Sequence, residues 1–370
     1  MAASKRRLFI DWARGFAVLC MIQHHAFDAW MPDSFHGSPP DHFFRFMGGV
    51  AAPTFLFLAG VAMVMMMEAA HARGQSRREA AWTACKRGFG IFVAAHLFRF
   101  QQWALWWGAA PWTDLVRIDV LNCIGIALML TAGVWSLGPS RRARALLFFI
   151  ACAVVVVCSP WIWAADLSRW PWLAADYVKG LPPRALFPLF PWIAFAFAGA
   201  LPGLLLAQIR AAKDPDRFEA RVVIGLSLGS VALWFATRFV DGLDFHLYAN
   251  LEWWRTSPAY FILRCCSELW LIGVCWLVER AFAGFWASRK HLGPLVLLGR
   301  HSLLVYWVHI EIVYGRWFWG QRGKLSLAQA ATWVVVVIAA MVALSWAAER
   351  FDEWRAARKK RPATPAAAIA

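Results

Sequence analysis

Two histidines near the C-terminal end of the first apolar stretch carry side chains suited to acid–base chemistry. His24 and His25 lie within residues 8–31, and Asp28 follows His25 by three positions. An imidazole changes its charge near neutral pH, so it can serve as a general base or as a nucleophile. At helical spacing, a carboxylate three residues away can orient the ring and raise its basicity. We predict that His25 and Asp28 are catalytic; a core histidine bonded to a neighbouring helix is the alternative for His25.

His25 shares one helical face with two further ionisable residues. At about 100° per residue, His25 returns to within about 40° of Asp11 and Arg14, whereas His24 falls about 140° from Asp11. This shared face ranks His25 above His24. For Asp11 and Arg14 themselves, three positions apart, an internal ion pair is the alternative to a binding role.

Ionisable and amide side chains recur in four further apolar segments. A charged group inside a membrane costs several kcal/mol unless it is paired or hydrated, so each of these residues is a functional hypothesis. They fall at a similar depth, which favours one polar cavity in the outward half of the bilayer. An Arg–Glu ion pair and a hydrogen-bonded seam between helices are the alternatives. The predicted substrate-binding residues are His96, Arg99, Asp119, Asn122, Arg264, Glu268, Tyr306 and His309.

The elements that position these residues are membrane helices. Of the 370 residues, 61% are hydrophobic and 16% are charged, whereas soluble domains have about 45–50% and about 25%. Crossing the hydrocarbon takes about 20 apolar residues in a helix. The sequence therefore predicts an all-α, polytopic transmembrane bundle of about ten spans, at approximately 8–31, 46–69, 85–107, 117–137, 145–164, 186–208, 221–240, 258–282, 294–316 and 325–349.

The distribution of positive charge predicts the orientation of the chain. With the N-terminus in the cytoplasm, 24 of the 38 Lys and Arg residues fall on the cytoplasmic side and eight on the opposite side. This bias predicts that both termini are cytoplasmic. The net charge of +16 lies in short runs between apolar stretches, so nucleic acid is not an expected partner. The eight cysteines form no CxxC pair, and no metal is expected.

Five sequence strings, in order, carry a resemblance to a known family. The opening, RRLFIDWARGFAVLCMIQHHAFDAW, resembles that of the heparan-α-glucosaminide N-acetyltransferase-like family of membrane proteins. The strings APTFLFLAG, RIDVLNCIGIALML, FPLFPWIAFAFAGALPG and LGRHSLLVYWVHIEIVYG follow in the family's order. The resemblance covers most of residues 7–318 and implies a single transmembrane acyltransferase-like domain over residues 1–361. Residues 362–370 are expected to be a disordered tail.

The resemblance implies a bacterial inner-membrane enzyme with acetyl-CoA or another acyl-CoA as its co-substrate on the cytoplasmic side. The acceptor would be an extracytoplasmic glycan or amino sugar, and since family members can be dimers, a homodimer is a further expectation. The family's active site includes a histidine in the loop after the first span and a polar residue at the end of that span. Counted from Arg14-Gly15, these positions are His36 and His25. The chain lacks the Gly-rich and Trp-Asn-Gly stretch of the animal enzymes around this loop, which leaves the acceptor open.

The acyl-CoA would bind at the basic cytoplasmic face because its head carries phosphates. The predicted binding residues are Asp11, Arg14, Lys86 and Arg87. Asp11 and His25 lie about 21 Å apart along a helix, a gap that an extended pantetheine arm could cover. Side chains such as Arg99, Asn122 or Arg264 could stabilise an oxyanion. The alternatives are a transporter or flippase for an anionic envelope precursor, against which the lack of an evident internal repeat counts, and a non-enzymatic membrane scaffold.

Overall fold

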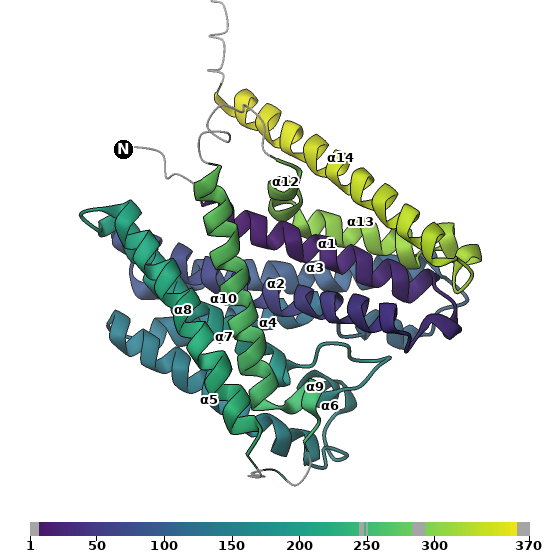
Figure 1. Ribbon diagram of the computed structural model, residues 1–370, viewed down its shortest axis with the longest axis horizontal. Helices are drawn as coiled ribbons and strands as arrows, with labels where there is room; N and C mark the ends of the chain where they lie inside the picture. Colours follow the sequence, from purple (N-terminus) through teal and green to yellow (C-terminus); the bar gives the residue numbers. More distant parts are fainter. Residues whose placement is uncertain (1–6, 244–247, 249–250, 283–292, 361–370) are drawn as a thin grey trace, which may run out of the picture. The chain divides into compact units, whose positions relative to one another are not determined.

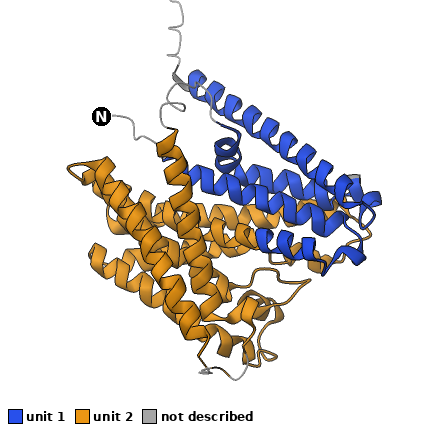
Figure 2. Cartoon of the chain, viewed as in Figure 1, with its two compact units in different colours: residues 1–48, 284–370 blue, residues 49–283 orange. Residues whose placement is uncertain are grey.

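The computed structural model describes residues 7–243, 248, 251–282 and 293–360. These residues form helices joined by short connections, and no strand occurs among them apart from an isolated bridge between Ile118 and Ala185. The all-α prediction is therefore confirmed for the described part of the chain. The predicted tail at 362–370 lies outside it. The chain divides into two compact units, residues 1–48 with 284–370 and residues 49–283 (Figure 2).

The first unit contains residues from both the N-terminal and the C-terminal part of the chain. Its helix α1 packs against α12, α13 and α14 (Figure 1). Helices α12 and α13 form a pair bent by 91°. Helix α2 begins in this unit and continues into the second. The elements are α1 (Leu8–Trp30), η1 (Asp33–Phe35), the start of α2 (Pro39–Ala72), α12 (Pro294–Arg300), α13 (Ser302–Tyr314), η4 (Arg316–Gln321) and α14 (Leu327–Lys360).

Two glycines allow the backbones of α1 and α12 to approach closely. A Cβ atom on Gly15 would clash with the carbonyl oxygen of Leu295, and one on Gly299 would clash with that of Asp11. Close approach of backbones at small residues is the usual way in which membrane helices gain contact without a hydrophobic driving force. The contact fixes α12 beside the N-terminal half of α1.

The second unit holds the middle of the chain. Helix α3 packs against α4, α5 against α7, and α8 against α10. Capping boxes define where α3 and α4 begin, at Ser76 and Asp119. The elements after α2 are α3 (Arg77–Leu105), η2 (Trp112–Val116), α4 (Val120–Leu137), α5 (Arg141–Ala164), α6 (Trp172–Lys179), α7 (Leu189–Leu206), η3 (Ala207–Ala211), α8 (Pro215–Asp241), α9 (Trp253–Thr256) and α10 (Pro258–Ala281).

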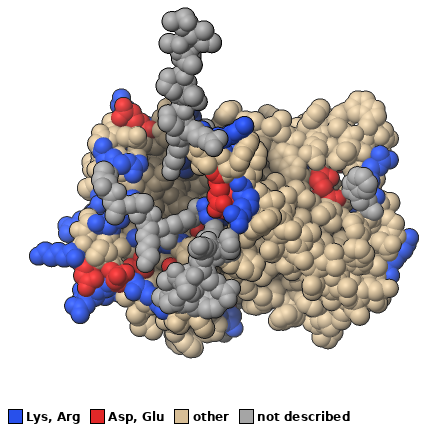
Figure 3. All heavy atoms as spheres, turned by 90° about the horizontal axis from the view of Figure 1, so that it is seen from above, with Lys and Arg blue, Asp and Glu red and all other residues tan. Residues whose placement is uncertain are grey.

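Seven helices among the described residues are long and apolar enough to cross a membrane, or eight if the bent pair α12–α13 counts as one span. The seven are α2, α4, α5, α7 with η3, α8, α10 and α14. Helices α1 and α3 coincide with two further predicted spans, but their polar residues lower their hydropathy. Figure 3 shows a broad surface without charged side chains, with the charged ones gathered mostly on the left of the view. Such a surface is typical of an integral membrane protein.

Candidate active site

The ring of His25 is held by a second histidine, in the first unit. The Nδ1 atom of His25 lies 2.9 Å from the Nε2 atom of His309, and the two rings are nearly parallel, with an interplanar angle of 6°. His309 is fully buried, and its Nδ1 atom lies 2.8 Å from the carbonyl oxygen of Val305. Tyr306 packs edge-on against His309. The structure thus brings together His25, Tyr306 and His309, three of the predicted site residues.

This chain of contacts assigns the proton positions on both rings. A carbonyl oxygen only accepts, so the Nδ1 atom of His309 donates to Val305, and in the neutral ring Nε2 is then the acceptor. The Nδ1 atom of His25 must therefore donate to His309. The proton of a neutral His25 is thus on Nδ1, and its Nε2 atom carries the lone pair. His25 is partly exposed, and Nε2 is the nitrogen through which a neutral His25 would accept a proton.

Asp28 is hydrogen-bonded to Tyr314, whereas the prediction paired it with His25. Its exposed carboxylate accepts a hydrogen bond of 3.1 Å from the Tyr314 hydroxyl, and the Tyr314 ring stands edge-on to the ring of His25. The hydrogen-bond partner of Nδ1 of His25 is His309, whereas the prediction gave Asp28 as the residue that orients the ring. Asp28 is therefore linked to His25 through Tyr314. Its catalytic role stays a prediction.

His36 lies in a polar cluster at the start of α2. The Nη2 atom of Arg45 lies 3.1 Å from the Nδ1 atom of His36, and Arg45 also donates through Nε to the carboxylate of Asp41, over 2.7 Å. The backbone N–H of Gly37 donates to the same carboxylate oxygen, over 2.8 Å. His24 lies within electrostatic reach of Asp28, Asp41 and Arg45. Two members of the His36 cluster, Asp41 and Arg45, are therefore electrostatic neighbours of His24.

The residues predicted to bind acyl-CoA fall in both units. In the first unit, Asp11 is buried, and the guanidinium of Arg14 lies 3.9 Å from its carboxylate. In the second unit, Lys86 and Arg87 are exposed on α3. An exposed cation can reach a phosphate without first losing a protein partner. The donor role of these four residues stays a prediction.

The second unit gathers four of the predicted substrate-binding residues beside α4. Arg99 donates to one oxygen of Asp119 from Nη2 and Nε, over 2.8 and 3.0 Å, while the other oxygen caps α4. Asn122 lies one turn into α4 and donates to the Tyr177 hydroxyl over 3.4 Å, and His96 bonds the backbone of its own helix. Sequence reasoning missed Tyr177, because α6 lies between the predicted spans 145–164 and 186–208. Burial raises the pKa of Tyr177 to about 12, so its phenol keeps its proton and can donate at neutral pH.

Two further predicted residues lie on α10 of the same unit. Arg264 donates to the Tyr260 hydroxyl over 2.9 Å, and Glu268 accepts a hydrogen bond of 2.5 Å from Thr54 of α2. Both side chains are buried. The predicted cavity that would join these residues to His25 draws on both units, so it stays a prediction.

A buried ion cluster in the second unit was also missed. Glu68 of α2 pairs with Arg144 of α5 and accepts a hydrogen bond of 2.9 Å from the indole of Trp135 in α4. The guanidinium of Arg144 also lies 4.0 Å from the Trp135 ring centroid. All three side chains are buried. A lone carboxylate within the second apolar segment is the one signal that could have identified this cluster.

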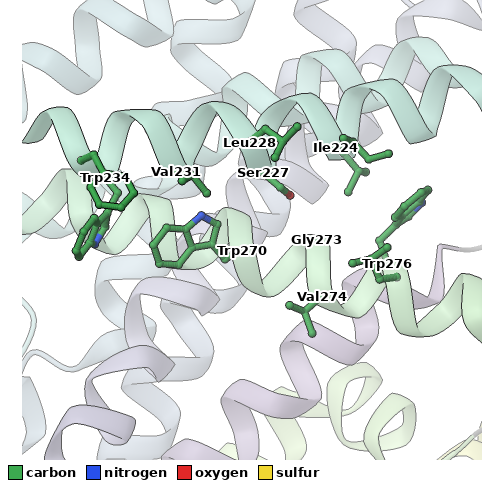
Figure 4. A pocket seen from close by; sticks show the side chains of 12 residues that line it. Ile224, Ser227, Leu228, Val231, Trp234, Trp270, Gly273, Val274 and Trp276 are labelled. Carbon is green, nitrogen blue, oxygen red and sulfur yellow. The ribbon is translucent and has the colours of Figure 1, made fainter.

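A cavity of about 540 Å³ between α8 and α10 does not have the character of an active site. Its lining is apolar except for Ser227 and the indole nitrogens of its tryptophans (Figure 4). It contains no predicted site residue and no titratable side chain. Acid–base chemistry therefore has no residue to use there. The described residues also contain no group of three or more His, Cys, Asp or Glu side chains that could hold a metal ion.

Comparison with known proteins identifies a family. The family model described as "Heparan-alpha-glucosaminide N-acetyltransferase, catalytic" matches residues 6–237, more than half of the chain. The matched residues include His25 and His36. The string at 298–315 and the residue that holds His25, His309, lie beyond them. No curated protein matches the chain in sequence.

Proposed function

Because the chain belongs to the heparan-alpha-glucosaminide N-acetyltransferase catalytic family, we propose that it is a transmembrane acyltransferase. It moves an acetyl or other acyl group from cytoplasmic acyl-CoA to a sugar amine or hydroxyl on the extracytoplasmic side. The observation that carries this proposal is the half-buried His25, whose Nδ1 is held by His309 and whose Nε2 lone pair remains for a substrate. Acyl transfer needs such a base to deprotonate the acceptor.

The proposed step uses His25 first as a base and then as an acid. The acceptor nitrogen or oxygen attacks the thioester carbonyl as its proton passes to Nε2 of His25. The resulting imidazolium keeps its hydrogen bond from Nδ1 to His309. When the tetrahedral intermediate collapses, the carbon–sulfur bond breaks and the thiolate of coenzyme A takes the proton from His25. The enzyme ends in its starting protonation state.

The proposed topology separates donor from acceptor. Ten spans, with α1, α3 and the bent pair α12–α13 counted among them, would place both termini in the cytoplasm of a bacterial inner membrane. Residues 1–361 would then act as one acyltransferase domain. On α1, Arg14 would bind the phosphates of acyl-CoA at the cytoplasmic face, about 16 Å from His25 along the helix axis. Lys86 and Arg87 of the second unit are the other proposed phosphate-binding residues. The polar residues of α3, α4 and α10 would bind the acceptor.

The test is release of coenzyme A from acetyl-CoA by the purified protein in nanodiscs. Glucosamine and galactosamine are offered beside glucose and galactose, so that amine and hydroxyl acceptors are compared on matched rings. We expect acceptor-dependent release that is lost in His25→Ala and kept in His42→Ala, an exposed histidine of the same unit. Absence of both release and acetyl-CoA binding would contradict the proposal and favour a transporter. An equal rate in His25→Ala would remove His25 as the base.

A further inference from the structure

We propose that the cavity between α8 and α10 binds one anionic phospholipid of the surrounding bilayer, with its phosphate at Arg221 and an acyl chain along the cavity. The volume of about 540 Å³ falls within the range of about 300–1,000 Å³ that is usual for ligand sites. All the lining residues belong to the second unit, and none of them is assigned to acyl transfer. The proposal is therefore independent of the proposed function.

The cavity is open on the side that faces the membrane. Both of its helices are long and apolar enough to cross a bilayer, and only 17% of the most apolar stretch of α8 is buried. Leu228 and Phe235 of α8 and Leu277 of α10 line the cavity and are nevertheless exposed. In a bilayer this rim meets the acyl chains of lipids. A chain can therefore enter the cavity from the side.

Two polar groups inside the cavity have no hydrogen-bond partner among the described residues. They are the hydroxyl of Ser227 and the indole N–H of Trp270, and both point into the space between the helices (Figure 4). A buried polar group without a partner costs free energy, and an indole N–H can only donate. The occupant should therefore carry acceptor oxygens on an otherwise apolar body. The ester carbonyls at the head of phospholipid acyl chains have this chemistry.

Charged residues close one end of the cavity, and their carboxylates are already engaged. Arg280 of α10 lies 3.1 Å from the carboxylate of Asp216 and 3.4 Å from that of Glu219. Glu219 also accepts a hydrogen bond of 3.0 Å from the indole of Trp276, which lines the cavity. These carboxylates are therefore held by partners on α10.

Arg221 is the cation at this end that remains for a phosphate. Its neighbour Arg217 lies 3.9 Å from Asp214, whereas the exposed Arg221 has no ion pair with a described residue. Arg221 precedes Leu228 by seven residues, so it shares the face of α8 that forms the cavity rim. A cation at the membrane surface attracts anionic lipids. Ser227 follows about 9 Å further along the helix axis, where the ester groups come after the phosphate.

Native mass spectrometry of the protein in detergent tests the site, with phosphatidylglycerol as the probe. We expect one retained lipid per chain, and its loss in Val231→Trp, which fills the cavity from its lining. Leu233→Trp, at an exposed position of α8 outside the lining, is the control and should retain the lipid. Arg221→Gln should weaken binding about fivefold. Arg142→Gln, which removes an exposed charge from α5, should leave binding unchanged.

Two altered lipids test the individual contacts. An ether-linked phosphatidylglycerol has no ester carbonyl to accept from Ser227. We expect Ser227→Ala to weaken binding of the ester lipid about two- to tenfold and to leave binding of the ether lipid unchanged. Diacylglycerol with the same chains lacks the phosphate, so the wild type should bind it about as weakly as Arg221→Gln binds phosphatidylglycerol.

Equal retention in Val231→Trp and Leu233→Trp, or in Arg221→Gln and Arg142→Gln, would overturn the proposal. A second copy of the chain is the other occupant that the test distinguishes. A dimer that cross-links through Leu228→Cys, together with a wild-type protein that retains no lipid, would show that the cavity is covered by another chain.

Discussion

The Nδ1 atom of His25 lies 2.9 Å from the Nε2 atom of His309, and His309 is anchored in turn to the carbonyl of Val305. The two histidines come from opposite ends of the chain. Their contact fixes which nitrogen of His25 holds the proton, and with it which nitrogen can accept one. In the proposed reaction, His309 would therefore act through His25.

Two substitutions of His309 should distinguish the loss of its hydrogen bond to His25 from the loss of its packing. In His309→Gln the amide oxygen can still accept from Nδ1 of His25, whereas His309→Leu removes the acceptor. We expect the Leu variant to lower kcat by about 10²-fold, within the range of general-base catalysis, and the Gln variant to recover part of that loss. Steady-state kinetics with acetyl-CoA measures both. Equal activity of the Leu variant and the wild type would contradict the positioning role.

The buried ion cluster of the second unit should be a major source of stability. Removing the Glu68 carboxylate leaves the buried Arg144 without its anion, which costs about 3–5 kcal/mol. Removing Arg144 leaves Glu68 paired only with the half-exposed Arg141, whose Nε lies 3.1 Å from its carboxylate, so a smaller loss is expected there. We therefore expect Glu68→Gln and Arg144→Met each to lower the melting temperature in detergent, and the double variant to lose less than their sum. Arg142→Met, at an exposed position beside the cluster, is the control. Additive losses in the double variant would show that the two charges do not interact.

The close backbone contact between α1 and α12 should leave no room for a side chain at Gly15. A Cβ atom at Gly15 would clash with the main chain at Leu295, whereas one at Gly133 of α4 meets nothing within 4 Å. Gly15→Ala should lower the melting temperature, while Gly133→Ala should raise it slightly because alanine favours a helix by about 0.5–1 kcal/mol. A stabilised Gly15→Ala protein would show that the two helices do not approach as described.

The orientation of the chain can be tested by reporter fusions. We expect a fluorescent protein that matures only in the cytoplasm to be active when fused after residue 360, and alkaline phosphatase, active only outside, to be inactive there. Both results follow from a cytoplasmic excess of Lys and Arg. A phosphatase inserted in the 165–185 connection should be active. The opposite pattern at both sites would invert the topology and move His25 to the cytoplasmic side.

The helices were predictable because their signal is local. Each of the ten apolar segments coincides with a helix or, at 294–316, with the bent pair α12–α13. The bend falls at Gly299-Arg300-His301-Ser302, a polar interruption that the prediction of one span over 294–316 passed over. The predicted starts of α2 and α3 were late by seven or eight residues (46 against Pro39, 85 against Arg77) because both helices extend beyond their apolar runs.

The contacts of the candidate site were less predictable because they are long-range. Nothing in the helical period of residues 8–31 indicates that His25 meets a residue 284 positions away, and the local carboxylate, Asp28, seemed the natural partner. Arg45 could have been found, because it follows Asp41 by one helical turn next to His36. Tyr177 offered no signal of this kind.

The most direct test of transfer across the membrane uses inside-out vesicles, which expose the cytoplasmic face. Labelled acetyl-CoA is added outside, and the acceptor active in the coenzyme A assay is sealed in the lumen. We predict labelled acceptor in the lumen with the wild-type protein and none with His25→Ala. Labelled acceptor that forms only when donor and acceptor share one side, or that forms equally with His25→Ala, would contradict a transmembrane acyltransferase that works through His25.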